Sequence, residues 1–140
     1  MNTAKKTIMV VDDDPDIIIQ LNAILGKEGY VLHSASTAAE AEELLLSVRP
    51  DLAIIDLMME ERDSGFVLCH QIKRLYPGTP VMMLTAVKSA TGLSFATDSG
   101  DEKSWLEADL LVDKPILPDQ LRADVRRLLS RTSPAERSGR

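Results

Sequence analysis

The sequence has little cysteine, no excess of positive charge and no long apolar run. Cys69 is the one cysteine among 140 residues, so an internal disulfide is excluded and a reducing compartment is favoured. The apolar run at residues 8–11 stops at three aspartates and is too short for a signal peptide or a membrane span. We therefore expect a cytoplasmic protein that does not contact the membrane.

Acidic residues outnumber basic ones in this sequence. Sixteen Lys and Arg residues stand against 22 Asp and Glu residues, which leaves a net charge of -6. A nucleic-acid groove needs clustered Lys and Arg to neutralise phosphates, so no nucleic-acid partner is expected. The length suits one domain with one core.

Five short β-rich segments alternate with segments of helical periodicity. The expected strands cover residues 7–11, 30–34, 51–56, 80–85 and 108–112. Apolar residues recur at helical spacing after them, as at Ile17, Leu21, Leu25, Ala41, Leu45, Val48, Leu68, Ile72, Leu75, Leu121, Val125 and Leu129. This alternation requires right-handed crossovers and a parallel sheet covered on both faces. We expect an α/β, doubly wound fold with a five-stranded parallel sheet.

Local signals mark where two of the helices begin. Asp14 is a typical N-cap residue and precedes a proline, which is favoured at the first helical position. Thr37 and Glu40 have the spacing of a capping box. Residues 86–108 are mixed in character, and there we expect a weak or broken helix within a long connection.

The residues that can carry chemistry follow the ends of the expected strands. They are Asp12, Asp13 and Asp14 after the first strand, Asp56 at the end of the third, Thr85 at the end of the fourth and Lys114 after the fifth. In open α/β sheets this edge is where ligands bind. Each residue alone is weak evidence, but together they place several acids, a hydroxyl and an ammonium group at one edge.

Clustered carboxylates repel one another unless a cation lies among them. Two unit charges about 4 Å apart cost roughly 1 to 4 kcal/mol at effective dielectric constants of 80 to 20. With oxygen ligands and no His or Cys nearby, Mg²⁺ is the natural cation. A Mg²⁺ ion beside a lysine and a threonine suits a phosphoryl group, and a carboxylate such as Asp56 can itself be the nucleophile.

Four sequence blocks carry a resemblance to a known family. They lie at residues 8–15, 51–56, 84–86 and 113–115 and include Asp12, Asp13, Asp56, Thr85 and Lys114. In this order they resemble the receiver domains of bacterial two-component response regulators. The resemblance implies a flavodoxin-like (βα)5 fold, with a receiver domain over residues 5–129 and a flexible C-terminal tail over residues 130–140.

The resemblance also implies a role for each of these residues. Asp56 would be the phosphoacceptor, and Asp13 and Asp56 would ligate Mg²⁺ together with the backbone carbonyl of Met58. Asp12 would act on the metal mainly through water. Thr85 and Lys114 would contact the phosphoryl oxygens, and the bond between Lys114 and the next residue, a proline, would be cis.

Three features depart from the family pattern. Leu111 stands where family members usually carry Tyr or Phe, three residues before the lysine. The separation between Thr85 and Lys114 is about seven residues longer than usual, and the loop after Asp56 lacks the usual proline. None of the three departures removes a residue of the expected phosphorylation site. They alter the parts of the domain from which family members contact their output partners.

The resemblance predicts a phosphoacceptor rather than an enzyme with a separate substrate, with phosphoryl transfer to Asp56 and slow autodephosphorylation. A sensor histidine kinase or a phosphotransfer protein would be the donor, and an unknown downstream protein would receive the output by protein contact. A pseudo-receiver and an aspartyl-nucleophile phosphatase are the alternatives. Such phosphatases usually use the first Asp of an Asp-x-Asp pattern after the first strand as nucleophile, whereas here the acids are adjacent and the expected nucleophile follows the third strand. A nucleotide or flavin carrier is disfavoured because no Gly-rich loop follows the first strand.

Overall fold

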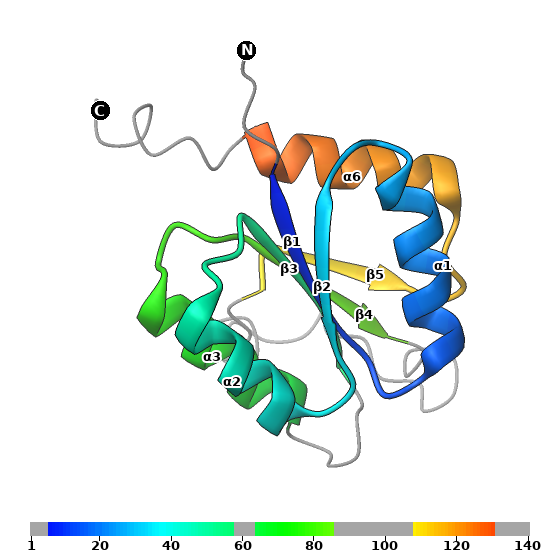
Figure 1. Cartoon of the computed structure of the whole chain (residues 1–140). Helices are drawn as coiled ribbons and strands as arrows, with labels where there is room; N and C mark the ends of the chain where they lie inside the picture. Colours follow the sequence, from blue (N-terminus) through cyan, green and yellow to red (C-terminus); the bar gives the residue numbers. More distant parts are fainter. Residues whose placement is uncertain (1–5, 58–63, 86–107, 131–140) are drawn as a thin grey trace, which may run out of the picture.

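The computed structural model describes residues 6–57, 64–85 and 108–130, which form one sheet flanked by helices (Figure 1). The strands are β1 (Thr7–Val11), β2 (Val31–Ala35), β3 (Leu52–Asp56), β4 (Val81–Thr85) and β5 (Leu110–Asp113). The helices are α1 (Pro15–Gly26), α2 (Ala38–Ser47), α3 (Ser64–Leu75) and α6 (Pro118–Ser130). The five expected strands are confirmed: β1 has the expected bounds, and no end of the other four is shifted by more than two residues.

Two expectations concern residues that the structure does not describe. The weak helix expected within residues 86–108 lies almost wholly outside the described residues, as does the tail beyond Ser130. Ser130 itself is the last residue of α6.

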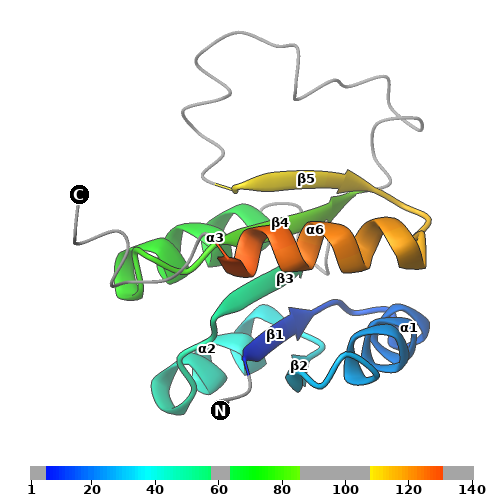
Figure 2. The same cartoon turned by 90° about the horizontal axis from the view of Figure 1, so that it is seen from above.

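The sheet is parallel throughout and has the strand order β2-β1-β3-β4-β5. Helices α1 and α6 pack on one face, and α2 and α3 pack on the other (Figure 1). Viewed from above, β2 and β5 form the two edges (Figure 2). This is the flavodoxin-like doubly wound order, and its switch point lies between β1 and β3.

Burial on both faces explains the composition of the central strands. Strands β3 and β4 are buried at every position, and β1 at all but its first. A strand covered on both sides reads as a continuous apolar run rather than as an alternation. The edge strand β2 carries half-buried His33 and exposed Ser34.

The expected helix starts are confirmed by their hydrogen bonds. The Asp14 side chain accepts a hydrogen bond from the N–H of Asp16 at 3.0 Å, and the Thr37 hydroxyl accepts one from the N–H of Glu40 at 3.0 Å. The Glu40 carboxylate in turn accepts from the N–H of Ser36, one residue before the cap, at 2.8 Å. Both caps hold the chain at the edge where the carboxyl ends of the strands lie. In the described part of the chain, no helix has the length and apolar character that crossing a bilayer requires.

Candidate functional site

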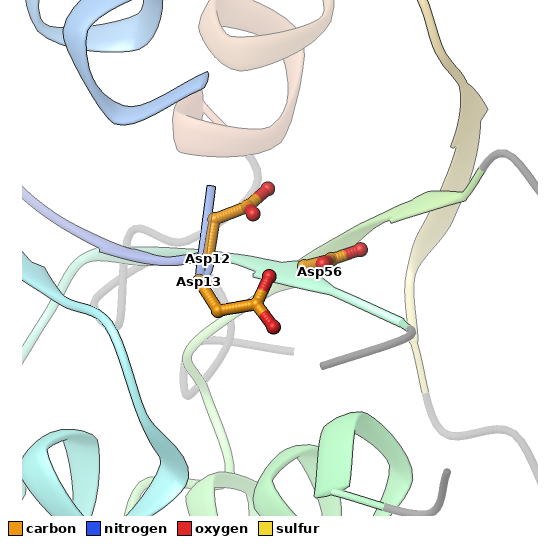
Figure 3. Close-up of side chains that lie close together, drawn as sticks. All are labelled: Asp12, Asp13 and Asp56. Atoms are coloured by element: carbon orange, nitrogen blue, oxygen red, sulfur yellow. The ribbon is translucent and has the colours of Figure 1, made fainter. Parts of the chain in front are cut away.

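Three carboxylates converge at the switch point of the sheet. Asp12 directly follows β1 and Asp56 ends β3, and these two strands are neighbours with Val11 paired to Ile55. Asp13 reaches the same place from the loop before α1 (Figure 3). One carboxylate oxygen from each of the three residues lies within 4.8 Å of those of the other two. The sequence expectation that these acids lie together is confirmed.

Asp12 is the most deeply buried of the three. Its side chain has no exposed surface, and its Oδ1 accepts a hydrogen bond from the N–H of Asp14 at 2.8 Å. Its Oδ2 is buried and has no hydrogen-bond partner among the described residues. Burial raises the pKa of the Asp12 carboxyl above its usual value, while the Asp14 N–H and the Lys114 ammonium oppose that rise.

Lys114 supplies the positive charge of the site. Its Nζ lies 3.4 Å from Asp12 Oδ2 and 3.5 Å from Asp56 Oδ1. Its backbone N–H donates to the carbonyl of Thr85 at 2.8 Å, which ties the end of β5 to the end of β4. Thr85 is buried at that end, and the bond between Lys114 and Pro115 is cis, as expected. The Lys114 ammonium group is therefore shared by the buried carboxylates of Asp12 and Asp56.

The donor set fits a small divalent cation. When ionised, the carboxylates of Asp12, Asp13 and Asp56 carry three negative charges and Lys114 one positive charge, which leaves the group at -2. All donors are carboxylate oxygens, which Mg²⁺ prefers, and Asp12 Oδ2 still lacks a hydrogen-bond partner within the described residues. Met58, whose carbonyl was expected to complete the ligand set, lies outside the described residues.

Gly65, in the first turn of α3, lies against the backbone of Asp56 and Leu57 and was not among the expected site residues. A Cβ atom at Gly65 would lie 2.8 Å from the backbone oxygens of Asp56 and Leu57 and 2.9 Å from the Leu57 Cα. Only glycine lets the first turn of α3 approach the end of β3 this closely. The signal in the sequence was a glycine inside a segment of helical periodicity, which has a packing reason here.

Comparison with known proteins identifies relatives over nearly the whole chain. The family model for the response regulator receiver domain matches residues 8–126. Response regulator MprA from Mycobacterium sp. (strain KMS) is 35% identical over 129 residues, which cover 92% of this chain. The DNA-binding response regulator MtrA from Mycolicibacterium smegmatis is 34% identical over 138 residues, which cover 97% of this chain.

Solved structures show the same similarity. Response regulator TrrA from Thermotoga maritima, in complex with Mg²⁺ and BeF, is 31% identical with a TM-score of 0.71. The match covers 88% of this chain and 98% of the TrrA chain. In contrast, this chain spans only 53% of MprA and 57% of MtrA, about half the length of these relatives.

Proposed function

The chain belongs to the response regulator receiver domain family, and from that premise we propose that it acts as a phosphoacceptor switch with Asp56 as the acceptor. A sensor histidine kinase or a phosphotransfer protein donates the phosphoryl group. The observation that carries the proposal is the position of Asp56 at the switch point, beside Asp12 and Asp13 and 3.5 Å from Lys114. This combines a nucleophile, a cation site and a fixed positive charge at one edge of the sheet.

The transfer follows from what each side chain offers. A carboxylate oxygen of Asp56 attacks the phosphorus atom of the donor, the bond from phosphorus to the donor's leaving group breaks, and an aspartyl phosphate forms. The Lys114 ammonium then neutralises a phosphoryl oxygen instead of two carboxylates, and the Thr85 hydroxyl donates a hydrogen bond to another. Asp13, Asp56 and the Met58 carbonyl would hold Mg²⁺, with Asp12 acting mainly through water, and the bound ion would supply further charge neutralisation.

The output is proposed to be a contact with a downstream protein in the cytoplasm. The chain turns over no separate substrate and loses its phosphoryl group by slow autodephosphorylation. The name of MtrA states that it binds DNA, and MtrA is almost twice as long as the part that this chain matches. We assign no nucleic-acid partner to residues 5–129 themselves, in line with their scarcity of positive charge.

The proposal is tested by removing the metal. With acetyl phosphate as the donor, the chain is expected to become phosphorylated in the presence of Mg²⁺ and to remain unmodified when EDTA is present. The physical reason is that the site without the cation carries a charge of -2 and repels the anionic donor. Equal phosphorylation with and without EDTA contradicts a role for the metal.

The Asp13→Ala variant is expected to bind Mg²⁺ more weakly and to be phosphorylated more slowly. Asp13 is an exposed member of the cluster, so its loss removes a ligand without opening a cavity in the core. We expect the Mg²⁺ dissociation constant to rise about tenfold or more, a range seen even for residues that only support a ligand. Calorimetric titration measures it. Asp16→Ala, an exposed acid one turn away, is the matched control and should leave the affinity unchanged.

A further inference from the structure

A groove with a volume of about 530 Å³ runs between α2 and α3, and none of the proposed site residues lines it. Its apolar surface comes from Leu46 on α2 and from Val67 and Leu75 on α3, whose side chains are 82%, 51% and 52% exposed. These are three of the six large hydrophobic residues that are exposed in the described part of the chain. Such a concentration in one place marks an interaction surface rather than scattered surface residues.

The two walls of the groove carry opposite charges. Helix α2 contains three glutamates and no basic residue, whereas α3 ends in Lys73 and Arg74 and contains no acidic residue. Glu42 lines one wall and Arg74 the other. Within the described residues neither side chain has an ion pair or a hydrogen bond, so both charges are available to a second molecule.

We propose that this groove is the contact surface between two copies of the chain, related by a two-fold axis. The axis passes through the middle of the groove, lies in the plane of the contact and is perpendicular to the line from Glu42 to Arg74. It therefore places each Glu42 opposite the Arg74 of the partner. A two-fold contact uses the same surface on both copies and therefore requires a self-complementary surface. A groove with Glu42 and exposed Leu46 on one wall and Arg74 and exposed Leu75 on the other has opposite charges on its two walls and apolar side chains on both, which meets that requirement.

The dimer is expected to be weak and reversible. The apolar surface consists of a few side chains from two helices, which places the contact at the small end of specific interfaces. The oppositely charged walls fix its orientation, because the other antiparallel arrangement of the two grooves brings Glu42 against the Glu42 of the partner and Arg74 against its Arg74. The dimer forms without phosphorylation, since none of the groove residues belongs to the phosphorylation site.

Analytical ultracentrifugation of the unphosphorylated full chain over a concentration series tests the proposal. The wild type is expected to shift from monomer to dimer as the concentration rises. Leu46→Gln removes the most exposed apolar side chain of the groove, and we expect its dissociation constant to rise about tenfold. The matched control is Leu117→Gln, which removes a leucine that is 63% exposed outside the groove and should dimerise as the wild type does. A wild type that stays monomeric, or a dimer weakened by Leu117→Gln and not by Leu46→Gln, overturns the proposal.

A charge exchange distinguishes a contact between identical copies from docking of a different protein. Glu42→Arg and Arg74→Glu each place like charges opposite one another at both ends of a two-fold contact, and each should weaken the dimer several-fold. The double variant restores opposite charges and should return to within about twofold of the wild type. Thermal unfolding confirms that these exposed substitutions leave the fold intact. A double variant that dimerises no better than the singles overturns the two-fold pairing of Glu42 with Arg74.

Discussion

The Asp56→Asn variant is expected to accept no phosphoryl group at saturating acetyl phosphate and Mg²⁺. The amide has nearly the same shape as the carboxylate, but it lacks the negative charge and the nucleophilic oxygen that form the aspartyl phosphate. Asp56 is the last residue of β3, at the switch point of the sheet, and Lys114 lies 3.5 Å from its Oδ1. We expect incorporation to fall by about a hundredfold or more, to the detection limit of a radiolabel or mass assay.

Asp16→Asn is the matched control, because it makes the same chemical change at an exposed acid in the first turn of α1. It should be phosphorylated as fast as the wild type. Phosphorylation of the Asp56→Asn variant at the wild-type rate would falsify the assignment and would direct attention to Asp12 and Asp13, the other two members of the cluster.

The Gly65→Ala variant is expected to lose about 1 to 3 kcal/mol of stability, the cost of forcing extra atoms into a packed core. The added Cβ would lie 2.8 Å from the carbonyl oxygens of Asp56 and Leu57, and backbone atoms cannot rotate away. Relief requires α3 or the end of β3 to move, which displaces Asp56. Phosphorylation should therefore slow as well. Urea unfolding measures the stability.

Gly78→Ala is the control for the effect of adding a methyl group to a glycine. A Cβ atom at Gly78 meets nothing within 4 Å, and Gly29 is the glycine with positive φ in the described part of the chain. Alanine at residue 78 should leave the stability unchanged or raise it by up to about 1 kcal/mol, since it restricts the unfolded chain. If Gly65→Ala is as stable as Gly78→Ala, the close approach of α3 to β3 does not constrain the fold.

The features that follow from neighbouring residues could be predicted from the sequence. Asp14 and Thr37 form the expected caps because each acts on N–H groups within three residues of itself. The strands could be located from their continuous apolar runs. The meeting of Asp12 with Asp56 followed once a parallel sheet was expected, since such a sheet brings the carboxyl ends of its strands to one edge.

The features that depend on tertiary packing could not be predicted. Asp12 and Asp13 are neighbours in sequence, but one is fully buried and the other exposed, and burial raises the pKa of the Asp12 carboxyl. The close contact of Gly65 with the backbone of Asp56 and Leu57 depends on the angle between α3 and the end of β3, and a glycine in the sequence does not reveal that angle. The groove at Leu46 arises from the spacing of two helices that are separated by a strand in sequence.

The start of β5 shows the same limit. Asp109 Oδ2 accepts hydrogen bonds from the Val81 N–H at 2.8 Å and from Lys73 Nζ at 2.7 Å. The acid therefore ties α3, β4 and the segment before β5 together, and β5 begins one residue after it. The sequence pattern predicted a strand from residue 108, because apolar periodicity does not reveal a side chain that satisfies the backbone of another strand.

The intact mass of the wild-type chain after incubation with acetyl phosphate and Mg²⁺ tests the central claim most directly. The account predicts a single addition of about 80 Da, the mass of one phosphoryl group on one aspartate. A chain that remains unmodified at saturating donor, while still binding Mg²⁺, would contradict the account and identify the protein as a pseudo-receiver that binds partners without phosphorylation.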